Sequence, residues 1–243
     1  MIIDNEQLLF VPFPYSFMIP IFSQTLSITL VGFYLGILIV ISETLRRYYQ
    51  ADSEITRKIV HIGAGQVILL AWWLNIPSYL ILWASFGASM VAIISYFLPI
   101  LPSVNGVGRK SLGTLFYALS IGILTFLFWD KSLPQFTAIG ILVMTWGDAS
   151  AALVGQRWGK HKYLFLGSKK SWEGSGTMMV VSAIVVLSIL SFVYPWHNYL
   201  LIIALSTAII ATFLETFSIV GIDNVTVPVF SAIFCYYLLQ LFS

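Results

Sequence analysis

Charged residues are scarce in this sequence. Asp, Glu, Lys and Arg make up 9% of the chain, 59% of its residues are hydrophobic, and the mean hydropathy is +0.92. Soluble domains carry about 25% charged residues. No stretch is long and polar enough to form a separate soluble domain. The composition therefore predicts one integral membrane domain over residues 1–243, with the lipid bilayer as its partner and no nucleic acid.

The sequence also lacks the residue clusters of several common sites. Its one cysteine, Cys235, excludes an internal disulfide and offers no cysteine metal motif. The three histidines are scattered, so no zinc-binding cluster is present. Neither a P-loop nor a kinase-type glycine loop occurs, so any nucleotide chemistry must use a different scaffold. No internal repeat is visible, which argues against an inverted-repeat transporter.

Long apolar runs make up most of the chain. Each is long enough for a helix, and turn or breaker residues separate them. The prolines and aromatics before the first run predict an interfacial segment over residues 1–22. The fold expected is an all-α, polytopic transmembrane bundle of about eight spans. The expected spans are 24–45, 59–74, 78–98, 112–129, 136–155, 175–194, 198–218 and 226–242.

Positive charge is distributed unequally between the two sides of this bundle. Of the twelve Lys and Arg residues, only Lys131 falls on one side. By the positive-inside rule, the other side is cytoplasmic, and both termini are outside. The cytoplasmic loops are then 46–58, 99–111, 156–174 and 219–225. The cytoplasmic cations are Arg46, Arg47, Arg57, Lys58, Arg109, Lys110, Arg157, Lys160, Lys162, Lys169 and Lys170.

The four carboxylates after Lys131 all fall in or near the cytoplasmic half. They are Asp148, Glu173, Glu215 and Asp223. An ionisable group inside a span is costly and marks a functional site by default. Asp148 has a structural ion pair as its alternative explanation, and Asp223 a turn or N-cap role. Because Mg²⁺ takes one or two carboxylates plus substrate phosphates, we expect it as the metal here.

A basic segment follows Asp148 and completes a region of interest over residues 147–174. Gly155 and Gly159 share a helix face with Asp148, which predicts either close helix packing or one wall of a cleft. The loop over residues 156–174 is rich in Lys and Arg, which suits phosphate but also suits a topology determinant. Ser171 stands where it can bind phosphate at a helix N-terminus or act as an N-cap.

Five short motifs, in this order, resemble the phytol kinase/dolichol kinase family of CTP-dependent polyprenol kinases. The compact chain is most similar to the phytol kinases. Residues 147–174 also resemble the signature of phosphatidate cytidylyltransferases, but the last apolar run, residues 227–242, lacks the charges those enzymes carry. The five motifs are RKIVHI at 57–62, GRK at 108–110, GDASA at 147–151, SKKSWEG at 168–174 and DNVTVP at 223–228.

The resemblance implies a phosphotransferase that moves the γ-phosphoryl group of CTP to an isoprenoid alcohol at the cytoplasmic face. Phytol is the expected acceptor, and phytyl phosphate would feed tocopherol or chlorophyll synthesis. A plasma or thylakoid-type membrane is implied as its location. A CDP-lipid synthase is the alternative. The length of the alcohol, CTP against other nucleoside triphosphates, and the oligomeric state stay open.

The resemblance also implies roles for particular residues. Asp148 and Asp223 would hold Mg²⁺ or orient the attacking hydroxyl, with Glu215 as a further metal ligand and Lys170 as a catalytic cation. Which aspartate acts as base is left open. The residues implied in nucleotide or phosphate binding are Lys169, Lys170, Ser168, Ser171, Glu173, Gly155, Gly159, Asn224, Arg57, Lys58 and Arg109.

Overall fold

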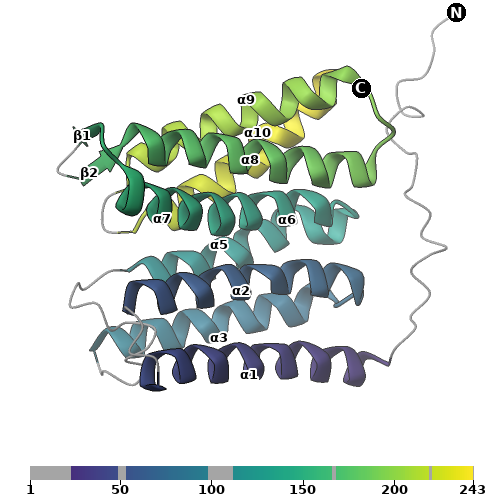
Figure 1. Cartoon of the computed structure of the whole chain (residues 1–243). Coiled ribbons are helices and arrows are strands. Elements are labelled where there is room, and N and C mark those ends of the chain that lie inside the picture. The colour runs from purple at the N-terminus through teal and green to yellow at the C-terminus, as the bar shows by residue number, and fades with distance from the viewer. Residues whose placement is uncertain (1–22, 49–52, 98–111, 166–167, 219–220, 243) are drawn as a thin grey trace, which may run out of the picture.

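The computed structural model describes residues 23–48, 53–97, 112–165, 168–218 and 221–242 (Figure 1). All eight predicted spans are helical, so the all-α prediction is confirmed. The helices are α1 (Gln24–Tyr48), α2 (Ser53–Trp73), α3 (Ser78–Phe97), α5 (Gly113–Phe128), α6 (Pro134–Leu142), α7 (Ala149–Trp158), α8 (Trp172–Val193), α9 (Asn198–Thr216) and α10 (Asp223–Phe242).

Within the described residues, seven helical segments are long and apolar enough to cross a membrane. The second predicted span is the exception, because the apolar part of α2 covers only Lys58–Trp73. Large apolar side chains cover much of the outer surface, including Phe33, Trp83 and Phe126. Such a surface suits a lipid environment, since lipid tails solvate apolar groups as well as protein does.

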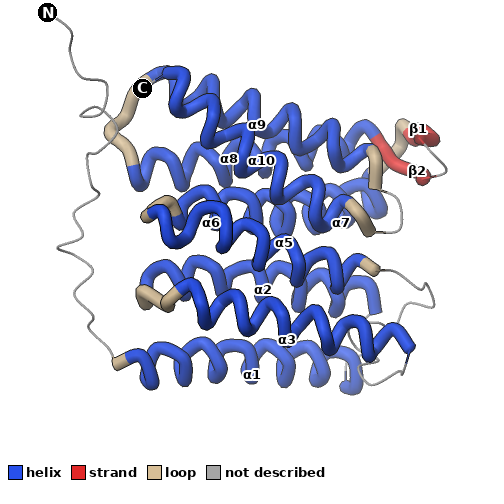
Figure 2. Tube along the Cα trace, turned by 180° about the vertical axis from the view of Figure 1, so that it is seen from behind, coloured by secondary structure: helices blue, strands red, loops and turns tan. Residues whose placement is uncertain are grey.

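The fifth span lies at the centre of the bundle. It is the most buried of the seven, and α2, α5, α8 and α10 all pack around it. Two views show α1 and α3 on one side of this span and α8, α9 and α10 on the other (Figures 1 and 2). Several of the best-buried side chains, among them Phe136, Ile139 and Met144, belong to this span. The central position makes Asp148 an interior residue.

The fifth span is not one uniform α-helix. After α6 the backbone widens into a π-helical segment, η3 (Val143–Asp148), and α7 follows directly. The wider turn changes the direction of every side chain after it, and π segments occur frequently at functional sites. Asp148 is the last residue of η3 and therefore takes its direction from this segment.

Two further boundaries differ from the sequence prediction. The segment expected as a loop over residues 156–174 contains an antiparallel hairpin of β1 (Lys162–Phe165) and β2 (Ser168–Ser171). Helix α10 begins at Asp223, so this residue starts the helix and does not lie in a loop before it. The interfacial segment predicted for residues 1–22 lies outside the described residues.

The hairpin marks one end of the bundle, which we call the hairpin end. Helices α2, α5, α8 and α10 begin at this end, and α1, α3, α7 and α9 finish there (Figure 1). The described chain starts and finishes at the opposite end (Figure 1). Helix directions thus alternate as the charge pattern predicted. The face of the membrane that each end meets stays a prediction.

Candidate active site

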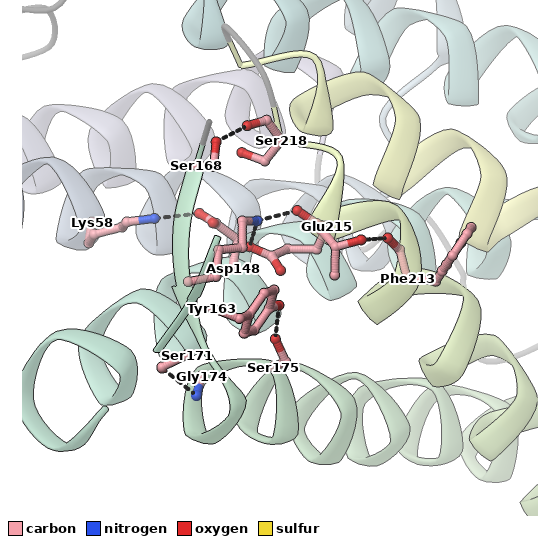
Figure 3. A network of polar contacts seen from close by, with 12 residues as sticks. Lys58, Asp148, Tyr163, Ser168, Ser171, Gly174, Ser175, Phe213, Glu215 and Ser218 are labelled. Carbon is pink, nitrogen blue, oxygen red and sulfur yellow. Dashed lines mark hydrogen bonds and ion pairs between the residues drawn. The ribbon is translucent and has the colours of Figure 1, made fainter. Parts of the chain in front are cut away.

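Charged side chains from five elements lie near one another inside the hairpin end. Figure 3 labels three of them, Lys58, Asp148 and Glu215. Lys58 comes from α2, Asp148 from η3, Lys170 from β2, Glu215 from α9 and Asp223 from α10. These residues are spread over more than half of the chain, and the folding of the bundle brings them together. The three carboxylates and Lys170 lie within electrostatic range of one another. We call these five residues the charged cluster.

Lys58 and Asp148 form the first ion pair of the charged cluster. The Lys58 ammonium donates a hydrogen bond to Oδ2 of Asp148. Both side chains are mostly buried, with 9% and 18% of their surfaces exposed. Sequence analysis placed Lys58 among the phosphate-binding residues, whereas here it is engaged with a carboxylate. The ion pair that stood as the alternative for Asp148 is therefore present.

Lys170 and Glu215 form the second ion pair. The Lys170 ammonium donates to the Glu215 carboxylate and also to the Glu215 main-chain carbonyl oxygen. Glu215 lies in the last turn of α9, and its carbonyl also accepts a hydrogen bond from the Ser218 amide at 3.2 Å. An ammonium group has three donors, so one donor of Lys170 has no acceptor among the described residues.

Among the described residues, Asp223 is the carboxylate of the charged cluster with no cation bound directly to it. It is buried, and its Oδ1 atom has no hydrogen-bond partner among the described residues. Its position in the first turn of α10 gives some compensation, because a helix N-terminus favours negative charge. The next residue, Asn224, donates from its side-chain amide to the Gly221 carbonyl at 3.0 Å. Asn224 thus shapes the turn before α10.

The charge balance of the cluster suits a bound cation. Of the charged cluster's described residues, two are ammonium groups and three are carboxylates, so these five groups carry one surplus negative charge when all are ionised. An uncompensated buried charge is strongly unfavourable. Among the described residues, no three His, Cys, Asp or Glu side chains converge closely enough to hold a metal alone. The donor set therefore fits an ion that shares its shell with substrate phosphates, as Mg²⁺ does.

The hairpin is fixed to the helices on both of its strands. Ser168 of β2 donates to the main-chain oxygen of Ser218, beyond the end of α9, at 3.1 Å. The hydroxyls of Tyr163 and Ser175 are 2.7 Å apart, which joins β1 to α8 (Figure 3). The rings of Phe165 and Phe217 also meet edge to face, with their centroids 5.0 Å apart. These contacts fix the position of Lys170, because Lys170 lies on β2 of the same hairpin.

Ser171 and Glu173 organise the start of α8. Ser171 accepts a hydrogen bond from the Gly174 amide at 3.1 Å, so its N-cap alternative is the arrangement found. Glu173 accepts from the main-chain amides of Lys160 and His161, each at 3.2 Å, and its Oε1 lies 2.8 Å from Nδ1 of His161. Both side chains are therefore engaged with protein groups, and their phosphate-binding roles stay predictions.

Gly155 and Gly159 allow the hairpin to approach α7 closely. A Cβ atom at Gly155 would lie 2.9 Å from Oγ of Ser171, and one at Gly159 would lie 2.8 Å from the same atom. Real Cβ atoms are almost never this close to another heavy atom. Close packing, one of the two alternatives for this helix face, is thus present. A direct contact of either glycine with nucleotide stays a prediction.

Of three further cationic residues predicted for the site, one lies apart from the charged cluster and two have side chains outside the described structure. Lys169 precedes Lys170 on β2 but is exposed, because successive strand residues point to opposite faces. Arg57 is the neighbour of Lys58 on α2, and its side chain lies outside what the structure describes. Arg109 belongs to residues 98–111, which are likewise outside the described ranges.

Sequence reasoning missed two residues that position the site. Ser218 and Tyr163 hold the hairpin against α9 and α8, and neither carries a charge that would attract notice. The sequence offers no clear signal for them, because Tyr163, Leu164 and Phe165 are consecutive apolar residues and the alternation of the strand appears only in their burial.

Comparison with known proteins decides the family. The chain is 51% identical over 208 residues to the phytol kinase of Synechocystis sp., covering 86% of this chain and 89% of that one. It is 25% identical over 228 residues to phytol kinase 1, chloroplastic, of Arabidopsis thaliana, covering 80% and 69%. A probable chloroplastic phytol kinase of Zea mays is 30% identical over 199 residues, covering 73% and 64%. No protein-family model and no solved structure matches.

The chain belongs to the phytol kinase family. The resemblance drawn from the five motifs is therefore confirmed, and the protein is a phosphotransferase with an alcohol as acceptor. The likeness to phytol kinases also favours phosphoryl transfer over CDP-lipid synthesis.

Proposed function

We propose that the protein transfers the γ-phosphoryl group of CTP to phytol, giving phytyl phosphate and CDP, with Mg²⁺ as the metal. The observation that carries this proposal is the charged cluster inside one end of an otherwise apolar bundle, in a chain so similar to a phytol kinase. Phosphoryl transfer depends mainly on positioning and on neutralising charge, and the cluster offers groups for both.

The acceptor suits the surroundings of the cluster. A phytyl tail is apolar and dissolves among the helices or in the adjacent lipid, while its hydroxyl needs polar partners. Asp148 offers such a partner at the boundary, since it lies deep in the central span but close to the hairpin end. The alcohol can therefore bring its hydroxyl to the cluster without exposing its tail to water.

Lys170 is the residue best placed to meet the nucleotide. It keeps one donor after binding Glu215, and it lies on a hairpin whose outer face carries the exposed Lys169. A nucleotide arriving from water would first meet exposed cations such as Lys160, Lys162 and Lys169. Lys170 would then hold the transferring phosphoryl group, where a fixed ammonium stabilises developing charge.

The carboxylates supply the proton acceptor. As the alcohol oxygen bonds to phosphorus and the bond to the CDP oxygen breaks, the hydroxyl proton passes to Asp148 or Asp223. Lys58 would hold Asp148 in one orientation during this step. Asp223 has a buried oxygen with no partner, so it is the carboxylate most suited to Mg²⁺. When bound, the metal would neutralise phosphate charge.

We propose that the hairpin end faces the cytoplasm. Eleven of the twelve Lys and Arg residues belong to the helix ends and loops on that side, and positive charge is retained inside. The cytoplasm is also where a soluble nucleoside triphosphate is available. The membrane would be of plasma or thylakoid type, which accords with the chloroplastic location named for the plant relatives.

The test is a product assay with purified protein in detergent, Mg²⁺, γ-labelled CTP and phytol. We expect label in phytyl phosphate and one CDP for each molecule formed. Parallel reactions with ATP, GTP and UTP rank the donors, and farnesol and geranylgeraniol rank the acceptors. Release of labelled pyrophosphate only when phosphatidic acid is present would overturn the proposal in favour of a CDP-lipid synthase.

A further inference from the structure

A buried tyrosine near the charged cluster has a hydroxyl with no hydrogen-bond partner among the described residues. Tyr117 of α5 is buried in the main hydrophobic core, and its hydroxyl makes no hydrogen bond to any described residue. A phenol hydroxyl normally finds a partner when it is buried, because leaving it unpaired costs free energy. A phenylalanine would fill the same space without that cost. Among the described residues nothing pairs with this hydroxyl, so it is free to bind a ligand that carries a polar group.

The position of Tyr117 connects it to the charged cluster. Its ring packs against His61 of α2, with the ring centroids 4.7 Å apart. His61 lies one helical turn beyond Lys58 and on the same face of α2, since residues three apart are neighbours on a helix. His61 also lies within electrostatic range of the Asp148 carboxylate. A row of polar groups thus leads from Asp148 past Lys58 and His61 to Tyr117.

This row lies on the apolar side of the cluster. Lys170 and Glu215 approach the cluster from the hairpin and α9, the side on which the exposed Lys169 lies. Tyr117 comes from α5, which carries no Lys, Arg, Asp or Glu, and lies among core side chains. A ligand that reaches Tyr117 must therefore be mainly apolar. It must also carry one small polar group for the unpaired hydroxyl.

We propose that Tyr117 binds the acceptor alcohol by donating its hydroxyl proton to the alcohol oxygen. An isoprenoid alcohol has the required chemistry, because its tail is apolar and its single hydroxyl is terminal. The hydrogen bond uses one lone pair of that oxygen and leaves the other free to attack phosphorus. The alcohol proton then points away from Tyr117, towards a carboxylate of the cluster. This inference rests on the proposed function.

The test is Tyr117→Phe, which removes the hydroxyl and keeps the ring. We expect the KM for phytol to rise about 5- to 10-fold, the usual worth of one hydrogen bond. The KM for CTP and the melting temperature should not change, because the hydroxyl has no protein partner to lose. Inhibition by phytane, the hydrocarbon without a hydroxyl, should be equal for both proteins. An unchanged KM for phytol would overturn the inference.

A matched control lies on the same helix. Thr125 also has a buried hydroxyl with no partner, but it is eight residues further along α5, about 12 Å from Tyr117. Thr125→Val should leave both KM values as they are. If Tyr117→Phe instead lowers the melting temperature and raises both KM values together, the hydroxyl is structural and the inference is wrong.

The inference and the proposed function can fail separately. If the unaltered protein does not phosphorylate phytol, the proposed function fails. Phytol binding measured by calorimetry in detergent still tests Tyr117, because weaker binding by Tyr117→Phe supports the contact and equal binding refutes it. If the unaltered protein is active and Tyr117→Phe has the same KM for phytol, only the inference fails.

Discussion

Lys58 and Asp148 are 90 residues apart in the sequence and form a buried ion pair between α2 and the central span. The pair lies where two requirements meet. Asp148 must stay ionised in apolar surroundings to serve as a base or a metal ligand, and a buried carboxylate needs a cation to do so. Lys58 supplies that cation from the first turns of α2. The pair therefore has both a structural and a chemical consequence.

The structural consequence can be measured with a double-mutant cycle. Lys58→Met leaves Asp148 buried without its cation, and we expect the free energy of unfolding to fall by about 3–5 kcal/mol. Adding Asp148→Asn removes the stranded charge and should recover most of that loss. Unfolding in mixed SDS–detergent micelles gives the change in unfolding free energy for each single variant and for the double variant, relative to the unaltered protein. Additive effects of the two substitutions would show that the residues do not interact.

The chemical consequence appears in turnover. Asp148→Asn should abolish phosphorylation, because an amide can neither accept the hydroxyl proton nor neutralise a metal ion. The Lys58→Met/Asp148→Asn double variant should be equally inactive although its stability is recovered. Asp130→Asn is the matched control, since Asp130 is exposed at the opposite end of the bundle. Near-normal activity of Asp148→Asn would refute its place in the site.

Lys169 and Lys170 allow a comparison between neighbouring lysines. Lys170→Met removes the ammonium that binds Glu215, and we expect kcat/KM to fall about 100-fold or more, as when a stabilising donor is lost from a transition state. Lys169→Met removes an exposed charge, so only the KM for CTP should rise, and less so at high salt. Steady-state kinetics with CTP varied at two salt concentrations separates these effects.

An equal loss in both lysine variants would mean that the hairpin does not hold Lys170 apart from Lys169. Glu215→Gln provides a further check on the same pair. It leaves the Lys170 ammonium with its main-chain acceptor but without its carboxylate. A circular dichroism spectrum and a melting curve for each variant show whether the bundle is intact, so that lost activity is not confused with unfolding.

Hydropathy was sufficient to predict the helices because a bilayer requires long apolar runs. The turns of the helices were harder to predict. The π-helical segment at residues 143–148 could not be recognised in the apolar run, because its residue types fit an α-helix as well as a π-helix. The direction of Asp148 depends on that segment, so its neighbours could not be derived from spacing alone.

The partners of the charged residues were also beyond sequence reasoning. Charge partition correctly grouped Lys58, Lys170 and Glu215 at one end of the bundle, but it does not say which helices are adjacent. The pairing of Lys170 with Glu215 depends on a hairpin of four-residue strands, which the Lys-rich composition of the segment concealed. The sequence motifs were sufficient to identify the family, but the packing of the helices and the hairpin determines which charged residues form ion pairs.

The orientation of the bundle can be tested by cysteine labelling, because the single native cysteine is buried. In a Cys235→Ala background, Lys169→Cys reports on the hairpin end and Ser132→Cys on the opposite end. We expect a membrane-impermeant maleimide to label Ser132→Cys in intact spheroplasts and Lys169→Cys only after lysis. The reverse pattern would place the hairpin end outside the cell and separate the site from cytoplasmic CTP.

Asp223 gives the sharpest test of the metal. Its Oδ1 atom is buried and has no partner among the described residues, so ionising this carboxylate is unfavourable unless a cation binds to it. In EDTA, Asp223→Asn should therefore melt at the same temperature as the unaltered protein or higher, because neutralising an uncompensated buried charge is favourable. With Mg²⁺ and CTP, the unaltered protein should gain stability by mass action and the variant should not.

Activity should change in the opposite direction to stability. Asp223→Asn should lose turnover at every Mg²⁺ concentration if Asp223 holds the metal, whereas a variant that only weakens binding would recover activity in excess Mg²⁺. Asn224→Ala is the matched neighbour, since Asn224 donates to the Gly221 carbonyl and its loss should reduce stability. A less stable Asp223→Asn protein that keeps its Mg²⁺ dependence would show that Asp223 is a helix-start residue and that the metal binds elsewhere.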